Sequence, residues 1–177
     1  AAELHDALVG FFQPKVLAGL HVLLTAGPTF EALDPVRGLT NLSSGRMGFA
    51  LARAARDAGA SVTLVSGPVA LPTPAGVVRV DVLSAGEMRE AVLRHVRETD
   101  IFIGVAAVAD YRPEQTAAQK IKKAAQPLTL TLQPNPDILA EIAALPKPPF
   151  CVGFAAESEN LDEYAQGKRM AKKLPLV

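Results

Sequence analysis

The chain has 177 residues, of which 49% are apolar and 5% aromatic, a composition typical of one α/β domain with a single large core and not of a disordered or disulfide-rich protein. Lys and Arg total 18, as do Asp and Glu, so no net charge attracts nucleic acid or an anionic membrane. The one cysteine excludes an internal disulfide, and the sequence contains no bilayer-spanning apolar run and no signal peptide, so we expect a cytoplasmic protein without nucleic-acid or membrane partners.

Apolar periodicity predicts strands that alternate with helices along the chain. Helical spacing between Leu4 and Phe12 predicts a short helix and a linker in residues 1–18, and the missing initiator Met indicates a cut or processed chain. The expected strands are short apolar runs at residues 21–25, 61–65, 77–82, 101–108, 128–132 and 150–155. The expected helices begin near Ser44, Ser84, Pro136 and Leu161 and end near Gly59, Val96, Leu145 and Lys173. Residues 174–177 resemble the start of a further strand.

This alternation favours a mainly parallel sheet with helices on both faces. Right-handed crossovers make the arrangement a doubly wound, Rossmann-like α/β fold. In such sheets ligands bind beyond the carboxyl ends of the strands, where the direction of winding reverses. We therefore expect residues 27–48, 106–110 and 154–157 to lie on one rim of the sheet.

The connection at residues 25–48 is much longer than a strand-to-helix turn requires. It contains Arg37 and Asn41, and it ends in S-S-G-R-M-G at residues 43–48, where a helix begins. Glycines let the backbone approach an anion closely, and a helix N-terminus offers unpaired N–H groups and a partial positive charge. The segment therefore predicts a phosphate-binding loop. In the simpler alternative, Ser44 only caps the helix and the glycines only shape a turn.

A second basic segment follows the strand expected at residues 101–108. Residues 112–126 are polar and rich in lysine and predict a mobile loop or flap. Its K-I-K-K run at residues 120–123 could close over a polyphosphate and neutralise developing charge, although a solvated basic turn explains the same residues. The three histidines are scattered without ligand spacing, so the sequence predicts no protein-bound metal.

Binding of NAD(P) is the main alternative function. It requires G-x-G-x-x-G directly after the first strand and an acidic residue at the end of the second strand, and the sequence has neither. Tyr164 and Lys168 do match the Tyr-x-x-x-Lys dyad of short-chain dehydrogenases, so an oxidoreductase stays open. A non-catalytic nucleotide-binding domain is a second alternative.

Six motifs occur in one order: T-A-G-P-T with L-D-P-V-R, N-x-S-S-G-x-M-G, A-A-V-A-D-Y, K-I-K-K, N-P-D-I and V-G-F-A-A-E. Together they resemble bacterial phosphopantothenate–cysteine ligase, also called phosphopantothenoylcysteine synthetase. The resemblance implies that residues 19–177 form the ligase domain and that residues 1–18 are the end of a preceding domain and its linker. Members of the family continue well beyond Lys173-Leu174, which implies a ligase domain that is incomplete at its C-terminus.

The resemblance implies one reaction of coenzyme A biosynthesis. The carboxylate of 4′-phosphopantothenate attacks the α-phosphate of CTP to give an acyl-cytidylate and pyrophosphate, and the amine of L-cysteine then displaces CMP. Mg²⁺ arrives with the triphosphate and needs few protein ligands. The family also implies a homodimer in which one subunit helps to complete the partner's site, and a fused flavin-dependent phosphopantothenoylcysteine decarboxylase domain.

The family's functional residues can be carried over to the matching positions of this sequence. Lys120, Asn41 and Arg37 would be the catalytic residues. Lys120 would stabilise the attack on the nucleotide phosphates. Asn41 and Arg37, with the backbone of Ala106 and Ala107, would hold the phosphopantothenate and acyl-cytidylate side. The expected nucleotide-binding residues are Lys120 itself, the phosphate-cradling Ser43, Gly45 and Gly48, and further Asp110, Pro136, Asp137, Ile138, Leu139, Phe154, Lys168 and Lys172.

Overall fold

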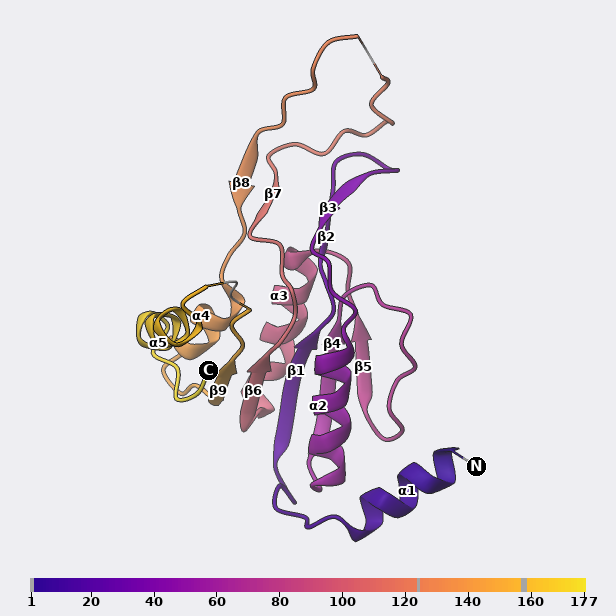
Figure 1. Ribbon diagram of the computed structural model, residues 1–177, viewed down its shortest axis with the longest axis vertical. Helices are drawn as coiled ribbons and strands as arrows, with labels where there is room; N and C mark the ends of the chain where they lie inside the picture. The colour runs from indigo at the N-terminus through magenta and orange to yellow at the C-terminus, as the bar shows by residue number, and fades with distance from the viewer. Residues whose placement is uncertain (1, 124, 157–158) are drawn as a thin grey trace.

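The computed structural model describes residues 2–123, 125–156 and 159–177, and the side chains of residues 2, 3 and 5–7 lie outside this description. Its centre is a five-stranded sheet in the order β5-β4-β1-β6-β9 (Figure 1). All four strand pairs are parallel. The chain winds outward from β1 in one direction and restarts at β6 in the other, which confirms the doubly wound, mainly parallel α/β fold. The strands are β1 (His21–Ala26), β4 (Ser61–Ser66), β5 (Val78–Asp81), β6 (Ile101–Gly104) and β9 (Phe150–Gly153).

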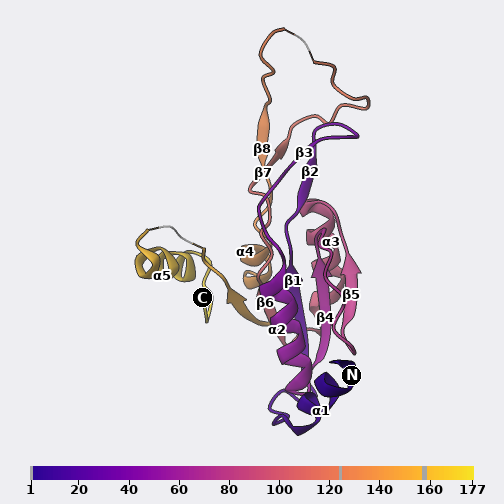
Figure 2. The ribbon, with the colours of Figure 1, turned by 45° about the vertical axis from the view of Figure 1, so that its right-hand side comes forward.

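Helices cover both faces of this sheet, and the sequence of β1 requires it. Leu23 packs in one core with α3 (Ala85–His95) and α4 (Ile138–Ala143), whereas Val22 and Leu24 pack in a second core with α2 (Arg46–Asp57). Successive side chains of a strand point to opposite faces. An unbroken apolar run can therefore be buried only if a layer lies on each side, and Figures 1 and 2 show α2 on one side of the sheet and α3 on the other.

Two helices begin at capping side chains. The Ser84 hydroxyl accepts a 3.1 Å hydrogen bond from an N–H in the first turn of α3, as predicted, and the short 3-10 helix η1 (Val96–Glu98) continues this helix. The Asp137 carboxylate accepts a 3.0 Å bond at the start of α4, so Pro136 precedes the cap. Ser44 is not the N-cap residue of α2, because that position is Gly45, with φ 73° and no capping side chain, although Ser44 Oγ accepts a 3.5 Å bond from Arg46 N in the first turn.

Two hairpins extend beyond the carboxyl ends of the sheet (Figures 1 and 2). Within the long 25–48 connection, β2 (Phe30–Ala32) pairs with β3 (Gly38–Thr40). β7 (Tyr111–Pro113) pairs with β8 (Leu132–Pro134) at the base of residues 114–131, which we call the flap. Asp34, at the turn of the first hairpin, accepts a 3.0 Å hydrogen bond from Ile121 N of the flap. The first hairpin therefore tethers part of the flap.

Several expected elements are shorter than the sequence predicts. The strand expected at residues 128–132 is wrong, because β8 starts only at Leu132 and the preceding Leu128 and Leu130 are exposed on the flap. β6 ends before the expected Val108, because the Thr25 hydroxyl accepts the next two backbone N–H groups in place of a strand partner. β9, α4 and α5 (Leu161–Ala171) each end two residues early.

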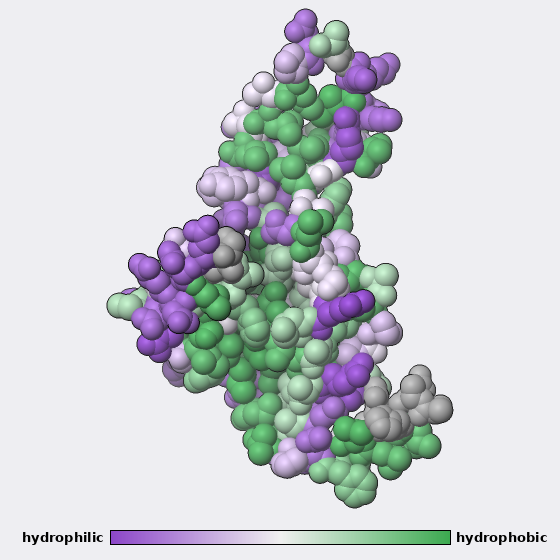
Figure 3. Space-filling view, in the orientation of Figure 1, coloured by the Kyte–Doolittle hydropathy of each residue, from purple (hydrophilic) through white to green (hydrophobic). Residues whose placement is uncertain are grey.

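The two outer helices contribute nothing to either core in the described part of the chain. α1 (Ala2–Phe12), the helix expected before the linker, lies at the end of the molecule opposite the hairpins (Figure 1). α5 has no buried residue and is largely hydrophilic on the face shown in Figure 3. A parallel bridge between Val152 and Leu176 places the last residues beside β9, where a further strand was expected. None of the described helices is long and apolar enough to cross a membrane.

Candidate functional site

A cavity of about 600 Å³ opens beyond the carboxyl ends of β1, β6 and β9. The winding of the sheet reverses between β1 and β6, so the cavity lies where ligands bind in doubly wound folds. Most of its lining comes from residues 104–110 at and after the end of β6, residues 135–139 at the start of α4, residues 154–156 after β9, and two lysines, Lys168 of α5 and Lys172 directly after α5.

The expected rim is thus brought together in part. Residues 106–110 and 154–156 both line the cavity, whereas Glu157, which was expected beside them, lies outside the described residues. Of the long 25–48 connection, only Thr25 and Met47 contribute to the lining. The cavity therefore sits closer to α5 than the sequence motifs suggested.

The segment 105–110 forms one wall, and side chains from two other segments hold it. Thr25 Oγ1 accepts two of its N–H groups at 3.2 Å each, and Thr29 Oγ1 accepts a third at 2.9 Å. Asn135 Nδ2 donates to Ala109 O at 2.8 Å. Thr25 and Thr29 are both buried, so the hydroxyl groups shape this wall without competition from water.

Asn41 reaches the same segment from the end of the first hairpin. Its Nδ2 atom donates to Ala107 O at 3.2 Å and to Val108 O at 3.0 Å. The structure therefore brings Asn41 next to the Ala106-Ala107 backbone, the pair of groups that the sequence assigned to one substrate, although Asn41 itself is not a lining residue.

Arg37 is engaged away from the cavity. Its guanidinium donates to the Asp34 carboxylate from Nε at 3.0 Å and from Nη2 at 2.6 Å, and Nη2 also donates to Ile121 O at 2.5 Å. Burial opposes ionisation of Asp34, but Arg37 and three backbone N–H groups outweigh it and hold the pKa of that carboxyl well below its usual range. Arg37 thus joins the first hairpin to the flap, and an anionic ligand would have to compete with Asp34 for it.

Lys168 of α5 and Lys172, directly after α5, place two ammonium groups on one side of the cavity, and the second is paired with a carboxylate. Lys172 Nζ lies 2.6 Å from Asp137 Oδ2, and Lys168 Nζ donates to Phe154 O at 2.6 Å. Burial opposes ionisation of Asp137, but the Lys172 ammonium and the capping N–H outweigh it and lower the pKa of Asp137. Phe154 is 38% exposed, so its ring can stack on a planar base.

The two residues that match the dehydrogenase dyad, Tyr164 and Lys168, do not lie together in one site. Lys168 lines the cavity, but Tyr164 does not and is 48% exposed on α5. A dehydrogenase dyad needs both groups at the same reacting atoms. The geometry therefore disfavours the oxidoreductase alternative.

The glycines and serines of the S-S-G-R-M-G turn have structural roles in packing α2 against β1 and in shaping the turn. A Cβ atom added to Gly48 would lie 2.5 Å from Ala26 Cβ and 3.3 Å from Thr25 O, so this glycine lets α2 approach β1 closely. Gly45 adopts φ 73°, a conformation that side chains disfavour, and Ser43 Oγ accepts a 3.3 Å bond from Gly45 N. Their role as a phosphate cradle remains a prediction.

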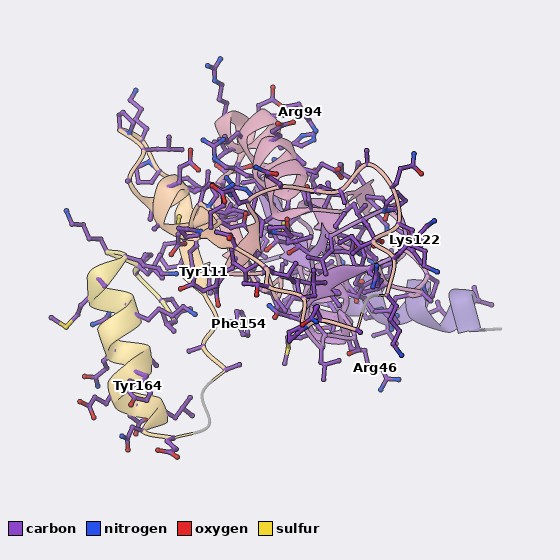
Figure 4. All side chains as sticks on the ribbon, turned by 90° about the horizontal axis from the view of Figure 1, so that it is seen from above. Arg46, Arg94, Tyr111, Lys122, Phe154 and Tyr164 are labelled. Carbon is purple, nitrogen blue, oxygen red and sulfur yellow. The ribbon has the colours of Figure 1, made fainter. Side chains whose placement is uncertain are left out.

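Lys120 of the flap is exposed and is not among the lining residues. The next residue, Ile121, is bonded to the first hairpin through both its N–H and its carbonyl group. Viewed from above, Lys122 of the same run lies well apart from Phe154 (Figure 4). In this conformation the flap does not bring its lysines to the cavity, and the catalytic role of Lys120 remains a prediction.

Other reactive groups are scarce in the described part of the chain. It contains no group of three or more His, Cys, Asp or Glu residues arranged to hold a metal ion. Cys151 is 1% exposed, and burial raises its pKa to about 11, so the thiol is a core group. The carboxylates that line the cavity are those of Asp110 and Asp137.

Sequence reasoning missed three residues that shape the site. Thr25 and Thr29 are the two threonines of T-A-G-P-T, and Asn135 is the first residue of N-P-D-I. Their motifs were noticed, but a side chain that bonds a backbone group some 80 positions away leaves no local pattern.

The sequence matches the family described as the DNA/pantothenate metabolism flavoprotein C-terminal domain over residues 17–177. The coenzyme A biosynthesis bifunctional protein CoaBC of Vibrio cholerae is 58% identical over 170 residues, which are 94% of this chain and 43% of that protein. CoaBC of Escherichia coli K12 is 54% identical over 177 residues, which are 97% of this chain and 44% of that protein. This chain therefore spans less than half the length of these curated relatives.

Solved structures agree with the fold. The crystal structure of the C-terminal domain of CoaBC matches with a TM-score of 0.81 and 43% identity, over 92% of this chain and 78% of that chain. A DNA/pantothenate metabolism flavoprotein from Streptococcus pneumoniae matches with a TM-score of 0.77 over 88% of this chain and 80% of that one. At 22% identity, the second likeness concerns the fold alone.

Proposed function

Because this chain belongs to the family of the DNA/pantothenate metabolism flavoprotein C-terminal domain, we propose that it is the ligase domain of a CoaBC-type protein and joins 4′-phosphopantothenate to L-cysteine with CTP. The observation that carries the proposal is the cavity at the reversal of the sheet. It has about 600 Å³, a hydrogen-bonded backbone wall and two lysines at the C-terminal end of α5. A volume of this order suits a nucleotide together with part of a second substrate.

The proposed reaction needs oriented anions and positioned cations more than it needs a strong base. The carboxylate of phosphopantothenate attacks the α-phosphorus of CTP, and the bond to pyrophosphate breaks. The amine of cysteine then attacks the acyl carbon, CMP leaves with the electron pair of the C–O bond, and the proton of the amine is released. Both steps build negative charge, so orientation and electrostatic stabilisation supply most of the catalysis.

The lining residues fit the two halves of this reaction. On the nucleotide side, Lys168 and Lys172 would bind phosphate, Asp110 and the start of α4 at residues 136–139 would position the nucleoside, and Phe154 would stack on the cytosine. Lys172 would then exchange its carboxylate partner for phosphate oxygens. Before the substrate arrives, the pair with the carboxylate keeps the Lys172 ammonium oriented.

On the other side, Asn41 and the Ala106-Ala107 backbone would hold phosphopantothenate and the acyl-cytidylate. Back on the nucleotide side, Ser43, Gly45 and Gly48 would cradle the nucleotide phosphates at the N-terminal end of α2. Lys120 and Arg37 belong to the flap and the first hairpin, which the Asp34 contacts join. Their proposed catalytic roles therefore require this unit to move toward the cavity of its own subunit or of a partner subunit when the substrates bind.

Mg²⁺ enters this proposal as part of the substrate, MgCTP. Mg²⁺ retains several waters and typically takes one or two carboxylates together with phosphate oxygens. Asp110 and Asp137 are the lining carboxylates that fit this demand, and a dedicated protein cage is not required. The ion would neutralise charge on the leaving pyrophosphate.

Further parts of the proposal concern the whole protein. The curated relatives are bifunctional, so residues 1–18 are proposed to follow a phosphopantothenoylcysteine decarboxylase domain, with residues 19–177 in the ligase domain. A homodimer and a cytoplasmic location, without nucleic-acid or membrane partners, complete the proposal.

The experiment that tests the proposed function measures pyrophosphate release by the full-length protein. Phosphopantothenate and CTP together should release pyrophosphate, and L-cysteine should then yield CMP and the amide product. ATP and NADPH serve as parallel ligands in a thermal-shift assay. CTP binding without pyrophosphate release would favour a non-catalytic nucleotide-binding domain, and stabilisation by NADPH alone would favour the oxidoreductase.

A further inference from the structure

Thr29 lies at the junction of three segments that the proposed substrate site needs. Its side chain is fully buried, and its Oγ1 atom accepts a 2.9 Å hydrogen bond from Ala109 N. Its backbone N–H donates to Ala107 O at 3.3 Å. Its own carbonyl accepts a 2.8 Å bond from the Thr40 hydroxyl at the end of β3. One residue therefore joins the wall of the cavity to the hairpin that carries Asn41.

A second set of hydrogen bonds links the hairpin directly to the wall of the cavity. Asn41 directly follows Thr40, and its amide donates to the carbonyls of Ala107 and Val108. A parallel bridge between Pro28 and Ala107, in which Ala107 N donates to Gly27 O at 2.9 Å, joins the Thr29 segment to the same wall. The position of the Asn41 amide relative to the wall is thus fixed from both ends, through its own hydrogen bonds and through Thr29.

Building on the proposed function, we propose that Thr29 is a positioning residue for the phosphopantothenate half of the reaction, because it sets the spacing between the Asn41 amide and the backbone at residues 106–109. Thr29 does not line the cavity, so it acts through these groups and not on the substrate itself. Most of the proposed nucleotide contacts lie on segments that Thr29 does not bond, at the start of α4 and near α5; the exception is Asp110, which directly follows Ala109. Loss of the Thr29 hydroxyl should therefore affect phosphopantothenate more than CTP.

The chain offers isosteric and matched variants. Thr29→Val keeps the shape but leaves the Ala109 N–H without an acceptor, a loss that acts at a buried group. Thr29→Ser keeps the hydroxyl. Thr63→Val is the control, because Thr63 is also buried and its hydroxyl bonds His21 Nε2 at 2.9 Å, near the amino end of the same sheet and away from the cavity.

The test is steady-state kinetics of product formation by the full-length protein with each substrate varied in turn. In Thr29→Val we expect the KM for phosphopantothenate to rise at least about fivefold while the KM for CTP changes less than about twofold. Thr29→Ser should restore the wild-type KM. Thr63→Val should lower the melting temperature and leave both KM values unchanged.

Should Thr29→Val fail to fold, Thr40→Val removes the neighbouring bond at an exposed position and should raise the same KM to a smaller extent. Equal changes in both KM values, or a fall in kcat alone that Thr63→Val reproduces, would reduce Thr29 to a structural residue and overturn the inference. If the wild type is active and Thr29→Val has the wild-type KM for phosphopantothenate, the inference is also overturned. A wild type that forms no product removes the proposed function, and the inference falls with it.

Discussion

Gly48 carries two roles that one set of variants can separate. A Cβ atom at this position would lie 2.5 Å from Ala26 Cβ, about 1 Å inside the optimum for two carbon atoms. Either α2 or β1 must move, and overpacking of this kind costs about 1–3 kcal/mol, while removing glycine from a helix returns about 0.5–1 kcal/mol. We therefore predict that Gly48→Ala lowers the free energy of unfolding by about 1–2 kcal/mol.

The double variant Ala26→Gly/Gly48→Ala moves the methyl group from the strand to the helix. The next contacts of the new Cβ, Ala26 Cα at 3.2 Å and Thr25 O at 3.3 Å, require shifts of only tenths of an ångström. We expect the double variant to be more stable than the sum of the single changes by about 1 kcal/mol or more. Gly86→Ala is the control, because its Cβ would meet only Ser84 Oγ, at 3.7 Å, and it should leave stability unchanged or slightly raised.

Denaturant unfolding of the wild type, the two single variants, the double variant and the control measures these values, and thermal melting checks them, since a change of this size shifts Tm by about 2–8 °C in a domain of this length. A Gly48→Ala protein as stable as the wild type would refute the packing argument, as would strictly additive effects in the double variant. If the double variant regains stability but still binds CTP weakly, then Gly48 also contacts the nucleotide. Recovery of both properties assigns Gly48 to packing alone.

Three further predictions follow from single contacts. Lys172→Met should raise the KM for CTP about tenfold or more, because a charge-assisted contact is lost. It should also make unfolding less sensitive to acid. The pKa of Asp137 is lowered in the folded protein, so its pair with Lys172 contributes stability above about pH 4, and this stability is lost as the pH falls further. Steady-state kinetics measures the first effect, and unfolding at about pH 6 and pH 3.5 measures the second. Arg89→Met, which breaks the partly exposed pair to Glu141 on α4, should cost no more than about 1 kcal/mol in urea unfolding and leave the KM for CTP unchanged. Cys151 should resist alkylation at pH values below its raised pKa until the protein unfolds, as mass spectrometry along a urea series would show.

The fold was predictable because its signals are local. The unbroken apolar run of β1 requires two covering layers, and the Ser84 cap and the glycine after α2 mark helix ends, so period and capping together give the doubly wound sheet. The two hairpins were not predicted. Their strands have only three residues each, too few for a period-two pattern to stand out.

The segments that line the site were predictable from the sequence, but the contacts between those segments and the rest of the chain were not. The rule for reversed winding placed residues 106–110 and 154–156 correctly. It could not show that Gly48 packs against Ala26, or that Arg37 is paired with Asp34 and the flap. Those contacts depend on the approach of elements distant in sequence, and spacing alone carries no information about it.

The most direct measurement is a crystal structure of the protein with MgCTP. The proposal predicts the nucleotide in the cavity between residues 105–110 and α5, with the cytosine on Phe154 and the phosphates within hydrogen-bond distance of Lys172. A second, smaller hollow of about 280 Å³ lies beside Arg46 and Phe49 on α2. A nucleotide bound there, with the cavity at the sheet reversal left empty, would contradict the proposal.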